Sequence, residues 1–205
     1  IMRLVGFCLL IKRAVIDVIG GMDEGYACGN FEDDDLCLRS FIAGYRNIMA
    51  EDVFVHHYGS MTFKGNAIDY SDTMDSNRQY FADKWKDIVE VKENRYNVRF
   101  TRAQQIEKLL NWGEERFSQG NLPSAVEVFR RILQIDRTNS QALNNLGVIQ
   151  WQIGDVVAAM ETFKTALKLN PEDPDALANL LQAAKETGRS ELIEQDFLDA
   201  LKKEH

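Results

Sequence analysis

Four consecutive acidic residues, Glu32 to Asp35, are the part of this sequence best suited to do chemistry. Placing four carboxylates together costs electrostatic repulsion unless a metal ion, a cationic group or a helix N-terminus offsets it. An apolar run with helical spacing, Leu36 to Ile42, follows at once, which predicts a helix over about residues 35–43. Asp33 or Asp34 would be its N-cap. The acids therefore predict either a cap that only begins a helix or a chemical site at that helix end.

Other motifs surround these acids. The sequence reads GGMDE from Gly20, FEDDDLCLR from Phe31, AGYR from Ala43, DVFVHH from Asp52 and NRxxFxxKW from Asn77. Together they resemble the family 2 glycosyltransferases, which have the GT-A fold, over roughly residues 4 to 86. The resemblance implies that residues 1–100 are the C-terminal, acceptor-side part of an α/β GT-A domain, and that the protein transfers a sugar with inversion.

The resemblance also implies roles for single residues. Asp33 matches the general base, which removes a proton from the acceptor hydroxyl, and Glu32 lies beside it; a base must lie within hydrogen-bond reach of that oxygen. Asp23, Glu24 and Asp35 would line the acceptor side of the pocket. An alternative for Asp23 and Glu24 is that they only form a loop at the end of a helix.

A divalent metal ion is also implied. Many members of the family have a His ligand 24 residues after the base, and His57 stands at that spacing from Asp33. A neutral imidazole suits Mn²⁺ better than Mg²⁺. The adjacent His56 leaves the ligand's position open by one residue. No Asp-x-Asp strand precedes residue 33, so we expect this sequence alone to lack the nucleotide-sugar donor site and to be inactive.

The secondary-structure elements that must position these residues are expected to be both strands and helices. Continuous apolar runs predict buried strands, and helical spacing bounded by Gly or Asp predicts helices. The expected elements are a strand over 4–11, a helix over 13–19, a strand over 47–54, an irregular loop over 56–75 and a helix over 76–87, whereas 88–99 has no clear period. Arg39 lies one turn into the helix after the acids and can pair with one of them.

From Thr101 onward the sequence repeats every 34 residues, in sets that share one residue type. These sets are Gly120, Gly154 and Gly188; Phe129, Phe163 and Phe197; Leu109, Leu143 and Leu177; and Asn111, Asn145 and Asn179. A helix-turn-helix period of this length is that of the tetratricopeptide repeat. We therefore expect residues 101–205 to form an all-α module of about three repeats, with Gly147 and Ala159 where two helices approach closely.

The three repeated asparagines, Asn111, Asn145 and Asn179, suggest a binding function. A regular row of Asn on the inner face of a superhelix can pair with the backbone of an extended peptide, because each amide offers donors and an acceptor. The alternative is that Asn is a consensus residue of the repeat and simply faces water. The repeats would recruit a protein partner or a carbohydrate or protein acceptor.

Composition limits the remaining possibilities. The net charge of −8 disfavours nucleic acid and anionic membranes as partners. The longest apolar run near the start is too short to span a bilayer, and three cysteines without metal-ligand spacing are typical of a reduced, cytoplasmic chain. The expected function is metal-dependent glycosyl transfer from a nucleotide sugar. The alternative is a non-catalytic repeat scaffold that carries a degenerate or truncated glycosyltransferase domain.

Overall fold

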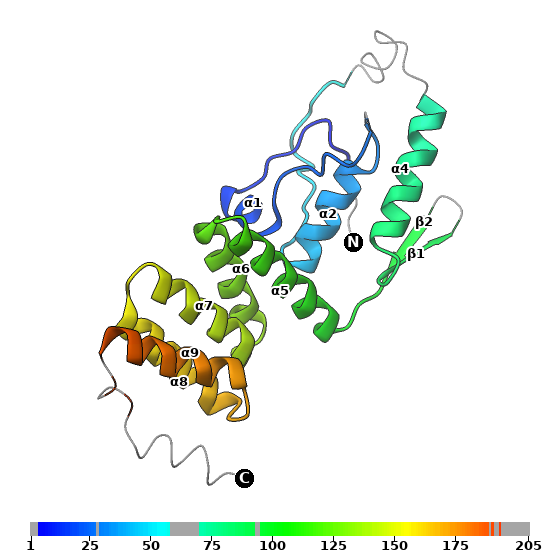
Figure 1. Cartoon of the computed structure of the whole chain (residues 1–205). Helices are drawn as coiled ribbons and strands as arrows, with labels where there is room; N and C mark the ends of the chain where they lie inside the picture. Colours follow the sequence, from blue (N-terminus) through cyan, green and yellow to red (C-terminus); the bar gives the residue numbers. More distant parts are fainter. Residues whose placement is uncertain are drawn as a thin grey trace. The chain divides into compact units, whose positions relative to one another are not determined.

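The computed structural model describes residues 4–27, 29–57, 70–92, 95–188, 190 and 193. The chain divides into two compact units, Ile1–Gln105 and Ile106–His205, whose elements are drawn in Figure 1. The first unit contains the acidic motif, and the second contains the repeats. None of the helices in the described ranges combines the length and apolar character that crossing a bilayer requires.

The described part of the first unit combines helices, one short hairpin and irregular segments. Its helices and strands are α1 (Arg13–Ile19), α2 (Glu32–Ile42), α4 (Tyr70–Lys84), β1 (Val89–Lys92) and β2 (Arg95–Val98). The two strands form an antiparallel hairpin in which Val89 lies opposite Val98. The hairpin occupies the segment for which the sequence showed no period, and α4 begins within the segment expected to be a loop.

Helix α2 lies at the centre of the first unit, and eight consecutive residues of it, from Asp33 to Ser40, are buried. The core of the first unit includes apolar side chains from α1, α2 and the α4–β1 region: Val18, Ile19, Leu36, Leu38, Ile42, Phe81, Trp85 and Ile88. Burying each large apolar side chain contributes about 1.5–3 kcal/mol. This packing fixes the helix that carries the acids.

Helix α2 begins three residues earlier than expected, at Glu32, and its N-cap is Phe31, which makes no side-chain capping hydrogen bond. The expectation that Asp33 or Asp34 caps this helix is therefore wrong. Asn30 and Phe31 both have positive φ, at 72° and 71°, and so turn the chain into the helix sooner. All four acids consequently lie in the first turn, where free backbone N–H groups favour negative charge.

The two strands expected at 4–11 and 47–54 do not form. A strand needs a neighbour to pair its N–H and C=O groups, and the only sheet within the described ranges is the β1–β2 hairpin. Several apolar side chains of these segments are exposed instead, including Leu10 and Phe54. The α/β arrangement expected for residues 1–100 is therefore not what the described residues of the first unit show.

The second unit consists of short-looped antiparallel helices, as the repeat period predicts (Figure 1). After α5 (Arg102–Ser118), which begins in the first unit, come α6 (Leu122–Ile135), α7 (Ser140–Gln152), α8 (Val156–Leu169) and α9 (Pro174–Thr187). Helices α6 to α9 each begin at a side chain that accepts a backbone N–H hydrogen bond, which stabilises a helix start: Asn121, Asn139, Asp155 and Asp173.

Close helix contacts in the second unit depend on small residues. A Cβ atom placed on Gly147 would lie 2.5 Å from Cε1 of Phe163, which is fully buried, and Gly113 has the same relation to Phe129. Gly147 and the buried Ala159 thus lie where the sequence predicted close approach. The third repeated phenylalanine, Phe197, lies outside the described residues.

Candidate functional site

Asp33 lies in the first turn of α2 and is held by two backbone amides. Gly6 N donates to Asp33 Oδ2 at 2.8 Å, and Asp34 N donates to Asp33 Oδ1 at 2.9 Å. A Cβ atom on Gly6 would lie only 3.1 Å from the Asp33 Cβ atom, so the absence of a side chain permits this approach. The carboxylate is 8% exposed and has a fixed orientation at the edge of the first unit.

His57 lies against the residue that follows Gly6. Its ring stacks on that of Phe7, with ring centroids 4.7 Å apart and an interplanar angle of 8°. The segment Gly6–Phe7 therefore contacts both Asp33 and His57, which the sequence proposed as base and metal ligand. His56 is exposed beside them.

A divalent metal needs several converging ligands. Within the part of the chain that the structure describes, no three His, Cys, Asp or Glu side chains are grouped so as to hold an ion. The role of His57 as a metal ligand stays a prediction.

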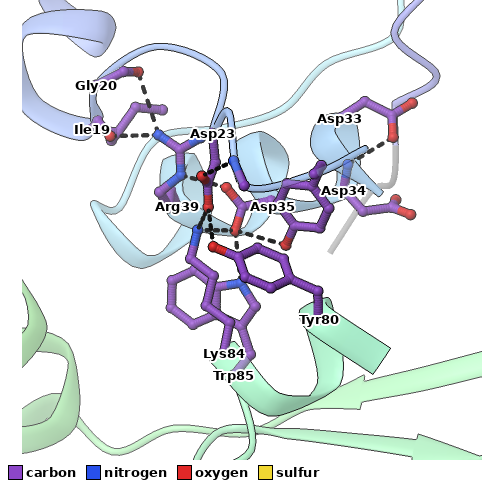
Figure 2. Close-up of polar contacts among 12 residues, drawn as sticks. Ile19, Gly20, Asp23, Asp33, Asp34, Asp35, Arg39, Tyr80, Lys84 and Trp85 are labelled. Atoms are coloured by element: carbon purple, nitrogen blue, oxygen red, sulfur yellow. Dashed lines mark hydrogen bonds and ion pairs between the residues drawn. The ribbon is translucent and has the colours of Figure 1, made fainter. Parts of the chain in front are cut away.

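Asp35 is the centre of a buried polar network (Figure 2). Its Oδ2 accepts a hydrogen bond from Arg39 Nε at 2.7 Å, and its Oδ1 accepts one from Trp85 Nε1 at 2.8 Å. Oδ1 also lies 2.7 Å from Lys84 Nζ and 3.3 Å from the Tyr26 hydroxyl. Asp35 is completely buried. Because protein donors contact both oxygens, this geometry gives Asp35 a role in organising the site, whereas the acceptor contact suggested for it remains a prediction.

Arg39 extends the network to the preceding loop. Its Nη1 donates to the backbone oxygens of Ile19 and Gly20, at 2.5 Å and 3.4 Å. It pairs with an acid, Asp35, as the sequence predicted. The guanidinium thereby ties the GGMDE loop to α2.

Asp23 lies at the other end of the network, where Lys84 bridges it to Asp35 (Figure 2). Asp23 Oδ2 is 2.6 Å from Lys84 Nζ, and it accepts a hydrogen bond from the Tyr80 hydroxyl at 3.2 Å. Partial burial alone would raise the pKa of the Asp23 carboxyl, but hydrogen bonds from Lys84 and from Gly25 N outweigh it and lower that pKa. Asp23 is therefore a charged anchor for its loop, while Glu24 is exposed.

Two tyrosines and a tryptophan surround Lys84. Its Nζ lies 5.7 Å from the centroid of the Tyr26 ring and 5.4 Å from that of Trp85. Burial raises the pKa of the Tyr26 hydroxyl, and the Asp35 charge raises it further. Tyr26 thus stays protonated and acts as a donor.

Glu32, the first of the four acids, is partly buried. Burial raises the pKa of its carboxyl, and the Asp33 charge adds to the increase. Its Oε2 atom is buried and makes no hydrogen bond to the described residues. The raised pKa makes the Glu32 carboxyl a weaker acid than an exposed glutamate.

Asn77 positions the loop that precedes the acids. This buried side chain donates to the backbone oxygens of Gly29 and Asn30, at 2.6 Å and 2.9 Å, and accepts from Ala27 N at 2.9 Å. These bonds hold the turn in which Asn30 and Phe31 have positive φ. No role was predicted for Asn77 from the sequence, although the NRxxFxxKW motif that begins with it was a signal for one.

The first unit also has a mainly apolar pocket of about 460 Å³ that contains none of the predicted site residues. Leu4, Leu9, Ile11, Val15, Cys37 and Tyr45 are among the residues that line it. Of the cysteines that the structure describes, Cys37 is buried and Cys8 is exposed, and neither forms a disulfide bond; Cys28 lies outside the described residues.

In the second unit, the repeated asparagines lie on helices α5, α7 and α9. Asn111 is exposed and Asn145 and Asn179 are half-buried. Asn145 Nδ2 donates to Glu114 Oε1 at 3.4 Å, and Asn179 Nδ2 donates to Asn144 Oδ1 at 3.0 Å. These bonds connect side chains of successive repeats and orient the amides.

Comparison with known proteins identifies the repeats. Residues 116–184 match the tetratricopeptide repeat family, so the second unit contains tetratricopeptide repeats. Over 53 residues, the chain is 40% identical to an uncharacterized protein, y4gI, of Sinorhizobium fredii. That match covers 26% of this chain and only 6% of the relative.

Proposed function

We propose that this chain binds a protein partner through the face of α5, α7 and α9 that carries Asn111, Asn145 and Asn179. The observation that carries the proposal is the tetratricopeptide match over residues 116–184, which includes Asn145 and Asn179 at the same position of successive repeats. Asn111, one period earlier, precedes the matched residues and is exposed. Such repeats suggest protein interaction, and the resulting surface is extended.

An extended peptide presents backbone N–H and C=O groups in alternation. Each Asn side chain offers both a donor and an acceptor, so it can pair with such a backbone whatever the peptide's side chains are. Each bond contributes about 0.5–1.5 kcal/mol. Hydrogen bonds to Glu114 and Asn144 already orient Asn145 and Asn179. Binding therefore costs less side-chain entropy than it would for freely rotating side chains.

Selection of peptides from a random library tests this function. The 205-residue chain is used as bait, and the affinity of the recovered peptides is measured by fluorescence anisotropy. Asn145→Ala and Asn179→Ala should each weaken binding about fivefold to tenfold, which corresponds to about 1 kcal/mol. Asn170→Ala, at an exposed turn outside the face, is the matched control and should leave affinity unchanged. Failure to recover any peptide that depends on Asn145 or Asn179 would refute the proposal.

Glycosyl transfer by the protein to which this sequence belongs is the second candidate. It is supported by the motifs that resemble family 2 glycosyltransferases and by the fixed Asp33 carboxylate beside the Gly6–Phe7 segment that contacts His57. In this candidate Asp33 accepts the proton of an acceptor hydroxyl, on a carbohydrate or a protein, as the hydroxyl oxygen attacks the anomeric carbon of the donor sugar. The bond from that carbon to the nucleotide breaks, the nucleoside diphosphate leaves with the electron pair, and Glu32 lies beside the base. The nucleotide-sugar donor, the Mn²⁺ or Mg²⁺ ion with His57 as one ligand, and the cytoplasmic location remain predictions within it.

A donor screen by nucleotide release tests the second candidate. The gene product that contains this sequence is incubated with uridine, guanosine, thymidine and cytidine sugar nucleotides, with and without Mn²⁺. Asp33→Asn should reduce turnover by on the order of 10² or more, because the variant lacks the proton acceptor. Asp17→Asn, on α1 and paired with Arg13, is the matched control. Equal turnover by the wild type and Asp33→Asn would exclude Asp33 as the base.

A further inference from the structure

The face that carries the asparagines has a one-sided charge. We define the amide face as the four positions at −4, 0, +3 and +7 relative to the repeated Asn in each of α5, α7 and α9, which lie along one side of a helix. Positions −3 and +4 are left out because in α7 and α9 they are filled by buried residues; in α5 they are Lys108 and Glu115, whose opposite charges leave the net charge of the face unchanged. The amide face consists of Glu107, Asn111, Glu114, Ser118, Gln141, Asn145, Val148, Gln152, Asp175, Asn179, Gln182 and Glu186, none of which is buried.

Four of these residues are acidic and none is Lys or Arg. The basic residues of the same helices occupy other positions, and one cation on each of α6 and α8 pairs with a local acid. Arg130 on α6 bonds to Glu127 at 2.9 Å, and Lys164 on α8 bonds to Glu161 at 3.0 Å. The negative charge of the amide face is therefore not balanced by a base on that face.

Glu114 is an acidic residue of the amide face and also lines a small pocket. It accepts hydrogen bonds from Gln141 Nε2 and from Asn145 Nδ2, both at 3.4 Å, the long end of the hydrogen-bond range. A pocket of about 40 Å³ lies beside it, lined by Glu114, Phe117, Phe129, Asn145 and Val148. Three of these residues are apolar, and the other two supply one carboxylate and one amide.

We infer that the partner is an extended basic segment whose Lys or Arg side chain inserts at Glu114. The aliphatic part of such a side chain can pack against the apolar residues that line the pocket, and its cationic group can pair with the Glu114 carboxylate. The longer-range attraction comes from Glu107, Asp175 and Glu186, which raise the rate of encounter with a positive segment and repel an acidic one. This inference rests on the proposed peptide-binding function and adds the chemical class of the partner.

Three synthetic peptides test the charge. They alternate Ser with Lys, with Gln or with Glu, and their binding to the 205-residue chain is measured by fluorescence anisotropy at low and moderate salt. The Lys peptide should bind at least tenfold more tightly than the Gln peptide and should weaken as salt screens the charges. The Glu peptide should bind more weakly than either.

Charge-removing variants locate the effect. The triple variant Glu107→Gln, Glu114→Gln, Glu186→Gln should bring the Lys peptide to the affinity of the Gln peptide. The matched control is Glu127→Gln with Glu161→Gln, which removes two acids from α6 and α8, and it should keep at least half of the wild-type affinity. Circular dichroism checks that each variant is folded.

The outcomes separate this inference from the function on which it rests. Equal binding of the Lys and Gln peptides, no binding of the Lys peptide, or an equal loss in the control variant would overturn the basic partner. The proposed function still stands in those cases if library peptides depend on Asn145 or Asn179. Loss of that dependence refutes the proposed function itself.

Discussion

Replacing Asp35 by Asn should destabilise the first unit far more than the same change at Asp33, although both residues lie in one acidic run. Asp35 is completely buried and contacts Arg39, Lys84 and Trp85. Asn keeps the shape of the side chain but loses its charge and replaces one accepting oxygen by a donor. One cationic or indole donor then faces an amide N–H group.

The magnitude follows from the burial of the partners. Removing one member of a buried ion pair costs about 3–5 kcal/mol, because the other charge stays buried without compensation. The Arg39 side chain is 8% exposed and incurs this penalty, whereas Lys84 is 27% exposed and keeps its pair with Asp23. We therefore expect the lower end of the range, about 3 kcal/mol.

Asp33→Asn is the matched comparison within the same helix turn. Within the described part of the chain, its oxygens accept from the backbone amides of Gly6 and Asp34, and the Asn oxygen can keep one of these two bonds. The loss of one hydrogen bond and of the favourable charge at the helix N-terminus costs about 1 kcal/mol. The difference between the two variants should be about 2 kcal/mol.

Hydrogen exchange measured by mass spectrometry gives the exchange rates of peptides from each unit separately. In Asp35→Asn, peptides from α2 should exchange about two orders of magnitude faster, as expected for a loss of about 3 kcal/mol. Peptides from α7 and α8 should exchange as in the wild type. The reasoning is refuted if α2 is equally protected in Asp35→Asn and Asp33→Asn, or if α7 and α8 change as much as α2.

Three further predictions concern packing, pH and ring stacking. Gly147→Ala should destabilise the second unit by about 1–2 kcal/mol in thermal unfolding, because the steric cost of the new methyl group against Phe163 exceeds the gain in helix propensity. The destabilisation should be smaller when the same change is made in a Phe163→Leu variant. Folding lowers the pKa of the Asp23 carboxyl, so its charge stabilises the first unit above about pH 4, and this stabilisation is lost as the pH falls through the lowered pKa. Urea unfolding at several pH values should show that Asp23→Asn is less stable than the wild type at neutral pH and equally stable in acid. Phe7→Ala should shift the His57 ring-proton resonances in NMR spectra, and unchanged resonances would exclude the stack.

The sequence by itself determined the architecture of the second unit. The 34-residue period fixed the helices of the repeats because each repeat depends on nearest-neighbour packing, which local spacing encodes. It also identified Gly147 as a site of close approach and Arg39 as the partner of an acid. Helix α1 was likewise predicted, over residues 13–19, because its apolar spacing and the following Gly20 are local signals.

Only the tertiary structure decided what the four acids do. Asp35 meets Lys84 and Trp85, which lie about 50 positions later in the chain, and no local pattern specifies such a contact. The apolar runs at 4–11 and 47–54 read as buried strands, yet a strand exists only where a neighbour pairs with it, and the described residues provide none. A run of like residues therefore divides into different roles, because burial and partners, rather than residue type, set the chemistry of each carboxylate.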